Sequence, residues 1–238
     1  MAIAPAAASS RSGSAGRDRP VRLARPKVAV DTVPFALERG RLKCFLVQLK
    51  HGAAAGQWAF PGGLVRRNEI LDDAARRELD AATGLADAYL EQLFTFGDPS
   101  RDPIAHVVSV AYMALTGDPH RARACCAKYL DAQWCEVSAL PPLAYDHAIV
   151  ADYALKRLRA KLEYTNIAAH LLPSSFTFAE LEDLYATLLD RPLDRRNFRR
   201  RIMAAGLLRP LDGMRRGAHR PAALYAFVQR SVQMIEML

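Results

Sequence analysis

One segment, from Phe60 to Leu85, constrains the fold of this chain more than any other. It begins with a rigid Pro-Gly-Gly turn and continues into a helix predicted from a polar N-cap near Asn68 to a stop at Gly84. Strands and a second helix are predicted around it, the strands over 27–37, 42–49, 90–96, 105–117 and 132–137 and the helix over 144–162. Strands before, between and after helices, without a repeating βαβ rhythm, favour a mixed-sheet α/β/α sandwich.

Past Tyr164 the pattern changes to short helices, predicted over 166–172, 178–189 and 195–205. The second begins behind Thr177, whose spacing from Glu180 is that of a capping box. Two apolar segments around a Gly-rich basic loop then predict a β-hairpin. Three helices and a basic hairpin form an α+β winged helix-turn-helix domain. We expect three parts: a tail over 1–25, an α/β domain over 26–160 and a winged domain over 161–238.

The tail is rich in Ala, Ser, Gly and Arg, and it has too little apolar surface to fold, so we expect disorder. Its composition mildly resembles an organelle transit segment, although solvated tails are far commoner. No apolar run approaches the ~20 residues of a membrane-spanning helix, which excludes a membrane protein. The cysteines lack the paired spacing of a zinc site, so we expect reduced thiols in a cytoplasm; they are Cys44, Cys125, Cys126 and Cys135.

Positive charge is concentrated at the two ends of the chain. The net charge is +8, and residues 191–230 alone carry eleven Arg against Asp194 and Asp212. Residues 1–25 carry five Arg against Asp18, so the remainder of the chain is net acidic. This asymmetry indicates that the C-terminal part binds a polyanion while the larger body does not. The alternative is an ordinary solvated charged surface.

The spacing Gly63-x5-Glu69-x7-Arg77-Glu78-Leu79-x-Ala81-Ala82-x-Gly84-Leu85 resembles the Nudix box, G-x5-E-x7-R-E-U-x-E-E-x-G-U, where U is a large aliphatic residue. The resemblance implies a Nudix fold, in which the acid of R-E and the next two acids hold divalent ions for pyrophosphate cleavage. Only Glu78 of these three remains. Positions 81 and 82 lie about 60° and 40° either side of position 78 on a helix, whereas Asp80 lies about 160° away. Because a lone carboxylate is a poor magnesium site, we expect neither a metal nor a catalytic residue.

A pyrophosphate near the degenerate box no longer needs a metal to shield it from carboxylates. Basic side chains could then bind it directly, with Arg101 the strongest candidate and Arg66, Arg67, Arg76 and Arg77 the others, although Arg77 is expected to pair with Glu69. Trp58 and Phe60 could flank a base or sugar, but packing is the commoner role for such aromatics. Phe94, Phe96 and Trp134 are assigned to the core. The predicted ligand site comprises Arg101, Arg77, Glu78, Trp58, Gly63 and Arg66.

The helix predicted over 195–205 has a basic face. Phe198, Ile202 and Ala205 fall on one stripe, and Arg196, Arg199 and Arg200 fall on the opposite side with Arg195 at its margin. Arg can bind guanine and Asn can bind adenine through two bonds each, although most protein–DNA bonds go to phosphates. The predicted DNA contacts are Arg195, Arg196, Asn197, Arg199 and Arg200 on the helix and Arg215, Arg216, His219 and Arg220 in the wing. His219 could instead be a turn residue, and His147 is expected to begin a helix rather than bind a ligand.

The combination extends the resemblance over about residues 24–228. A damaged Nudix box followed by YTNIAAHLLPSSFTFAELEDLYATLLDRPLDRRNFRRRIMAAGLL and HRPAALYAF is similar to the Nudix-related transcriptional regulators of NAD metabolism, NrtR. The resemblance implies a homodimeric repressor of NAD biosynthesis or salvage genes whose Nudix domain senses ADP-ribose or a related nucleotide, with no cofactor. Sister regulators sense sugar compounds, so the effector is less certain than the fold. The family likeness favours release of double-stranded DNA on effector binding.

Two other functions remain open. The first is an active ADP-ribose pyrophosphohydrolase with an accessory nucleic-acid-binding domain, in which Glu78 would act with Asp72, Asp102 or Glu69. The second is a binding module whose basic end binds RNA or an acidic protein.

Overall fold

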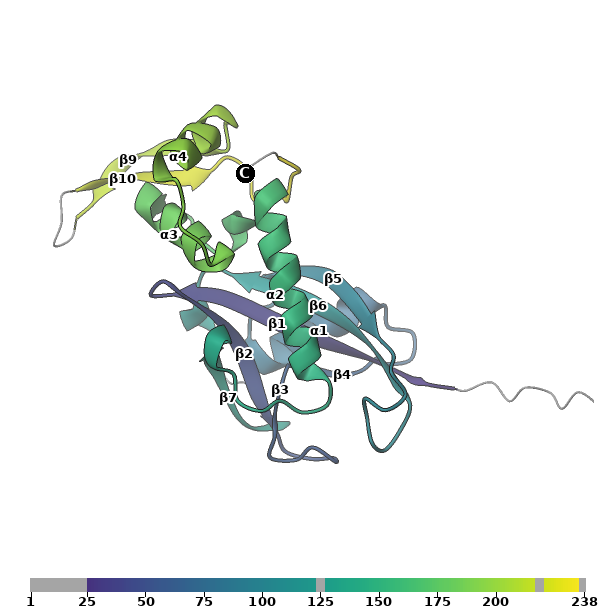
Figure 1. Cartoon of the computed structure of the whole chain (residues 1–238). Coiled ribbons are helices and arrows are strands. Elements are labelled where there is room, and N and C mark those ends of the chain that lie inside the picture. Colours follow the sequence, from purple (N-terminus) through teal and green to yellow (C-terminus); the bar gives the residue numbers. More distant parts are fainter. Residues whose placement is uncertain (1–24, 123–126, 217–220, 236–238) are drawn as a thin grey trace, which may run out of the picture.

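The computed structural model describes residues 25–122, 127–216 and 221–235. Two domains are joined by one long helix (Figure 1). The N-terminal domain consists of β1 (Lys27–Glu38), β2 (Arg41–Leu49), β3 (Trp58–Ala59), β4 (Gly62–Leu64), α1 (Leu71–Thr83), β5 (Tyr89–Phe96), β6 (Val107–Thr116), η1 (Pro119–Arg121), β7 (Tyr129–Glu136), η2 (Val137–Ala139) and α2 (His147–Tyr164). The C-terminal domain consists of η3 (Ile167–His170), β8 (Phe176–Thr177), α3 (Phe178–Leu189), α4 (Arg195–Ala204), β9 (Leu208–Arg215) and β10 (Ala222–Phe227).

The sheet of the N-terminal domain is mixed, as the sequence predicted. Its strand order is β3-β2-β1-β6-β5, with β4 paired to β1 and β7 paired to β2. β1 runs parallel to β6 and antiparallel to β2 and β4. The strands β3 and β4 were not predicted, because two or three residues are too few to show an alternating pattern.

The two faces of this sheet are covered by different helices. Val33 and Phe35 of β1 pack in the same apolar cluster as residues of α2, whereas Val30 packs with Ala74 and Ala75 of α1. Successive side chains of a strand point to opposite faces, so one apolar strand serves both layers. Figure 1 shows α2 lying across the front of the sheet and α1 behind it. The predicted α/β/α sandwich is confirmed.

Helix α1 begins later than predicted. The sequence indicated a polar N-cap near Asn68, but the N-cap is Ile70, which makes no side-chain capping bond. Asn68 instead has a φ of 63°, the left-handed conformation that Asn tolerates in turns. The acidic side chains of Asp72 and Asp73 lie in the first turn, where they interact favourably with the helix dipole. The predicted stop is confirmed: Gly84 is left-handed and donates its backbone N–H to Asp80.

The C-terminal domain has the winged arrangement. Its sheet has the order β8-β10-β9, and Thr177 and Glu180 form the predicted capping box of α3. The short helix predicted over 166–172 is a 3-10 helix, η3, that ends at His170. Ala205 was wrongly placed in the buried stripe of α4. It is exposed just past the helix end, where the chain turns through Gly206, while Phe198 and Ile202 are buried.

The two domains share one apolar cluster. It contains Phe35 and Met113 of the sheet, Leu158 of α2, and Tyr185 and Phe198 of the winged domain. Helix α2 continues to Tyr164, past the expected boundary at residue 160. Near its C-terminal end, Arg159 donates to the backbone oxygen of Leu188 at 2.7 Å and Lys161 binds Glu91 at 2.6 Å. A helix bonded to both domains can transmit a displacement from one to the other.

Several other predictions concern single residues or the ends of the chain. Phe94 was wrongly assigned to the core, because 47% of it is exposed on β5 beside Tyr153. The thiols of Cys44 and Cys135 are free. Cys125, Cys126 and residues 1–24 of the expected tail lie outside the described residues. Over the part of the chain that the structure describes, no helix has the length and apolar character to cross a membrane.

Candidate functional site

A cavity of about 190 Å³ lies beside the start of the segment that resembles the Nudix box. It is where β1, the turn between β3 and β4 and the start of α2 meet. Its lining includes Asp31, Phe60, Gly63, Arg101, Lys128 and His147. Pockets that enclose a complete small-molecule ligand usually measure about 300 to 1,000 Å³. This cavity therefore has room for part of a nucleotide, such as a diphosphate, with the remainder held outside it.

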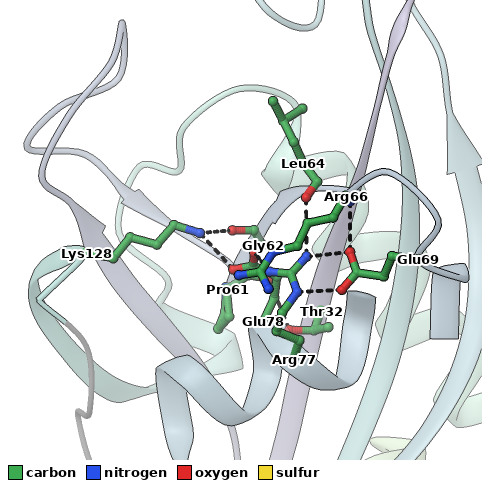
Figure 2. Close-up of polar contacts among 9 residues, drawn as sticks. All are labelled: Thr32, Pro61, Gly62, Leu64, Arg66, Glu69, Arg77, Glu78 and Lys128. Atoms are coloured by element: carbon green, nitrogen blue, oxygen red, sulfur yellow. Dashed lines mark hydrogen bonds and ion pairs between the residues drawn. The ribbon is translucent and has the colours of Figure 1, made fainter. Parts of the chain in front are cut away.

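Glu78 lies directly behind the cavity wall, in contact with the lining residue Lys128, and two protein cations bind it (Figure 2). Its side chain is 8% exposed. One carboxylate oxygen accepts from the Arg77 guanidinium, and the other accepts from Nζ of Lys128 at 2.7 Å. Lys128 also donates to the backbone oxygen of Gly62 at 2.5 Å. Both oxygens of Glu78 are therefore occupied.

Arg77 holds the loop that precedes α1. It donates to both carboxylate oxygens of Glu69, at 2.6 and 2.8 Å, and to the backbone oxygen of Leu64 at 3.3 Å. These bonds, with the backbone N–H of Arg66, hold the pKa of Glu69 at about 2. The predicted pairing of Arg77 with Glu69 is confirmed. The two bonds suit a fork-shaped guanidinium and a carboxylate, so Arg77 is chiefly a structural residue.

The surroundings of Glu78 do not fit a divalent metal. Ala82 is 1% exposed and packs with Phe45 and Val47, and Ala81 is half-buried. Among the described residues, no group of three or more His, Cys, Asp or Glu side chains could hold a metal ion. Since magnesium needs several oxygen ligands, the one carboxylate present, already bound by two cations, is insufficient.

The acids considered as helpers for Glu78 have other partners. Asp72 accepts from the hydroxyl of Tyr112 at 2.6 Å, and Glu69 is bound by Arg77. Asp102 lines the cavity but accepts the backbone N–H of Ile104 at 2.8 Å, which shapes its own loop. Each of these three carboxylates therefore has a hydrogen-bond donor of its own within the protein.

Arg101, the strongest sequence candidate for phosphate binding, lies in the cavity wall, where two aspartates balance its charge. Its side chain is 5% exposed. It donates to both oxygens of Asp146, at 2.9 and 2.7 Å, and to Asp31 at 3.3 Å. Asp31 and Asp146 reach this guanidinium from distant parts of the chain, so Arg101 remains a predicted phosphate ligand whose charge is already paired.

His147 is the first residue of α2, as predicted, yet it also belongs to the cavity wall. It is 3% exposed, and its Nδ1 accepts the backbone N–H of Phe60 at 2.9 Å. Its Nε2 lies 3.6 Å from Asp31. The pKa of Asp31 is raised by burial but lowered more strongly by His147, Ser109 and Arg101, to about 2. The floor of the cavity is thus a buried polar network attached to the beginning of α2.

Of the other residues considered as ligand contacts, some line the cavity and some do not. Gly63 lines the cavity, and a Cβ there would lie 2.4 Å from a carboxylate oxygen of Glu78, so this position needs glycine. Trp58 packs at the edge of the apolar core instead of lining the cavity. Arg66, Arg67 and Arg76 are exposed and do not line it either.

Sequence reasoning missed Lys128. It lies four positions before the strand predicted from Ala132, in no motif, and 50 positions from its partner Glu78. A single lysine before a strand carries no signal for a binding site, so only the folded chain identifies it.

The second candidate interface is the exposed face of α4. Arg195, Arg196, Arg199 and Arg200 are all exposed there, opposite the buried Phe198 and Ile202, as the helical periodicity predicted. Asp194 caps the helix by accepting the backbone N–H of Asn197 at 3.1 Å. A helix packed by one apolar stripe and presenting arginines on the other side is suited to a groove of nucleic acid.

These arginines differ in their own contacts. Arg195 binds Asp183 at 3.0 Å, and Arg199 lies over the ring of Phe178 at 4.6 Å. Arg215 of the wing binds Glu180. Arg200 donates to the side chain of Asn197 at 2.8 Å. Arg196 and Arg216 are exposed without an ion pair among the described residues, whereas His219 and Arg220 lie outside them.

A larger cavity, of about 570 Å³, lies between the two domains. Its two arginines are engaged: Arg121 binds Asp87 at 2.8 Å, and Arg230 donates to the backbone oxygens of Ala169 and Leu172. The smaller cavity adjoins Gly63 at the start of the Nudix-box segment, so it is the better candidate for a diphosphate.

Two family models match the chain. Residues 25–158 match the model of the NUDIX domain, and residues 168–227 match that of the NrtR DNA-binding winged helix domain. Together they cover both domains described above.

Three relatives are similar to this chain. An "ADPR responsive transcriptional repressor NtrR" of Acinetobacter baylyi is 32% identical over 85% of this chain and 82% of the relative. An "ADP-ribose pyrophosphatase" of Methanocaldococcus jannaschii is 33% identical over 54% of this chain and 73% of the relative. Shewanella oneidensis NrtR, crystallised with a 27mer DNA, is 33% identical over 84% of this chain and 93% of that chain, with a TM-score of 0.77. Its NUDIX domain, crystallised with ADP ribose, is 31% identical over 60% of this chain and 94% of that chain, with a TM-score of 0.54.

Proposed function

The chain belongs to the NrtR family of Nudix-related transcriptional regulators, and from this premise we propose that it is a DNA-binding repressor whose Nudix domain senses ADP-ribose or a related NAD-derived nucleotide. The exposed arginine face of α4 is the observation that carries the proposal. It lies on a domain packed through a common apolar core against a Nudix domain. The regulated genes would be those of NAD biosynthesis or salvage.

The ion pairs of Glu78 with Arg77 and Lys128 support a Nudix domain that binds its nucleotide without hydrolysing it. No cofactor is required for such binding. A relative that is a pyrophosphatase matches the Nudix part, so hydrolysis is the second candidate function. We test it directly: purified protein with magnesium and ADP-ribose should show no robust turnover. Turnover abolished by Glu78→Gln would favour the hydrolase.

Helix α2 supplies the connection between the two sites. Its first residue, His147, lines the cavity, and its C-terminal part bonds to the winged domain through Arg159 and Leu188. We infer that a nucleotide in the cavity shifts α2 and thereby the two recognition helices of a dimer, so that they no longer match successive major-groove turns. A coupling of only ~1 to 3 kcal/mol would change DNA affinity by 5- to 150-fold.

The assembly in this proposal is a cytoplasmic homodimer on double-stranded DNA. A two-fold symmetric dimer binds two half-sites about one helical turn apart, so the operator would be close to palindromic. A gel shift on the chain's own upstream region should give one discrete complex that survives competitor DNA and weakens with ADP-ribose. Equal binding to RNA, or loss of the complex in competitor DNA, would instead support a general binding module.

Single arginine variants test the surface. Arg196→Ala and Arg200→Ala keep a good helix former in α4, and each should weaken operator binding by about 10-fold or more if the side chain contacts a base. A phosphate contact would instead lower the slope of log affinity against log salt by about 0.9. Arg195→Ala should have a smaller effect, since Asp183 already binds that guanidinium. Lys156→Ala, which removes an exposed charge from α2, is the matched control.

A further inference from the structure

The divalent ions that the Nudix box implies do not fit this site, and Lys128 provides a positive charge in their place. Its Nζ contacts a carboxylate oxygen of Glu78 at 2.7 Å and the backbone oxygen of Gly62 at 2.5 Å. Carboxylate and carbonyl oxygens are the ligands that a hard divalent cation would use. To bind there, such an ion would have to displace the ammonium group.

The charges around the cavity wall support this substitution. Arg77 and Lys128 carry two positive charges, which balance the carboxylates of Glu69 and Glu78. Ala81 and Ala82 add no negative charge on the face of α1 that carries Glu78. A diphosphate therefore meets a neutral cluster, and the electrostatic reason for a shielding metal is removed.

Lys128 is also accessible from the cavity. Its side chain is 42% exposed and belongs to the lining, together with Gly63. By contrast, the other lining cation, Arg101, is 5% exposed and bound by two aspartates. Of these two cations, Lys128 has the more exposed side chain and is therefore the one that an incoming anion can approach from the cavity.

We propose that Lys128 is a built-in cation that contacts the diphosphate of the effector, so that nucleotide binding needs no metal and an incoming metal is excluded from Glu78. This inference rests on the proposed function, and it adds the residue that binds the diphosphate. It also explains how a box that keeps one of its three metal-binding acids can retain an anion-binding role.

Calorimetric titration of the full chain with ADP-ribose tests the proposal. Wild-type protein should bind with the same affinity in EDTA and in magnesium. Lys128→Met should weaken binding on the order of 10- to 100-fold, because it removes a charged hydrogen-bond donor, and Lys128→Arg should recover part of the loss. Lys156→Met is the control for removal of a remote lysine. Should Lys128→Met fold poorly, Lys128→Gln keeps a polar side chain and removes the charge.

Different outcomes identify which inference fails. Wild-type binding that requires magnesium, or equal affinity in Lys128→Met, would overturn the role of Lys128 while leaving the repressor function intact. If wild-type protein binds no ADP-ribose under either condition, the proposed effector is wrong. In that case, inorganic pyrophosphate replaces ADP-ribose as the probe in the titration. A wild-type pyrophosphate affinity that Lys128→Met does not reduce, or the absence of any pyrophosphate binding, would overturn the role of Lys128.

Discussion

Phe60 donates its backbone N–H to Nδ1 of His147 across 2.9 Å, which joins the turn before the Nudix box to the first residue of α2. The two rings also stack, with centroids 5.5 Å apart. Because Nδ1 accepts this bond, Nε2 is the ring nitrogen that carries a proton toward Asp31. One histidine thus connects the cavity floor to the helix that reaches the winged domain.

Replacing His147 tests this connection. His147→Ala leaves the buried N–H of Phe60 without an acceptor, which should lower the free energy of unfolding by about 1 to 3 kcal/mol. His147→Asn places an oxygen near the former Nδ1 and should lose less. Urea unfolding of the three proteins measures the difference. Equal stability of wild type and His147→Ala would show that the bond contributes nothing.

The buried carboxyl of Asp31 predicts a loss of stability in acid. Its pKa is about 2 in the folded protein and 3.8 when exposed. Since the folded value is the lower one, the ionised carboxylate stabilises the protein above pH 4. That contribution, about 2 kcal/mol, is lost as the pH falls from 4 toward 2. Urea unfolding between pH 5 and pH 2.5 should show a steeper decline for wild type than for Asp31→Asn. Parallel declines would contradict the assignment.

The domain junction contains a glycine that should control coupling. A Cβ at Gly117 would lie 2.4 Å from the backbone oxygen of Leu172, so Gly117→Ala must shift the backbone where the two domains meet. We expect ADP-ribose affinity to change little, while the effect of ADP-ribose on DNA binding falls toward none. Gly97→Ala, where the new Cβ would meet Val108 at an ordinary 3.7 Å, is the matched control. Fluorescence anisotropy of labelled operator with and without ADP-ribose measures both.

Restoring the two missing acids of the Nudix box, at positions 81 and 82, should lower the free energy of unfolding by different amounts. Ala82→Glu buries a carboxylate among Phe45 and Val47, which should cost about 3 to 5 kcal/mol if it stays unpaired. Ala81→Glu, at a half-buried position, should cost much less. The double variant should regain at best weak hydrolysis of ADP-ribose with magnesium, because Lys128 still binds Glu78. Thermal unfolding and a phosphate-release assay measure these effects, and vigorous turnover would mean that the site is otherwise intact.

The sequence by itself determined the features that depend on neighbouring residues. The 3.6-residue period of α4 places Phe198 and Ile202 inside and its arginines outside, and the spacing of Thr177 and Glu180 fixes the start of α3. The Nudix-box spacing indicated both the fold and the loss of two acids. Each of these signals lies within a short stretch of the chain, so it can be recognised without knowledge of distant contacts.

Only the tertiary structure decided which charges are available to a ligand. Asp146 neutralises Arg101 from 45 positions away, and Lys128 reaches Glu78 from 50 positions away. These pairs are set by how β1, the loops around it and the start of α2 come together. No local periodicity records that arrangement, because contacts of high sequence separation follow from strand register and loop path. The same arginine that is prominent in the sequence is therefore buried and neutralised, and an inconspicuous lysine lines the cavity.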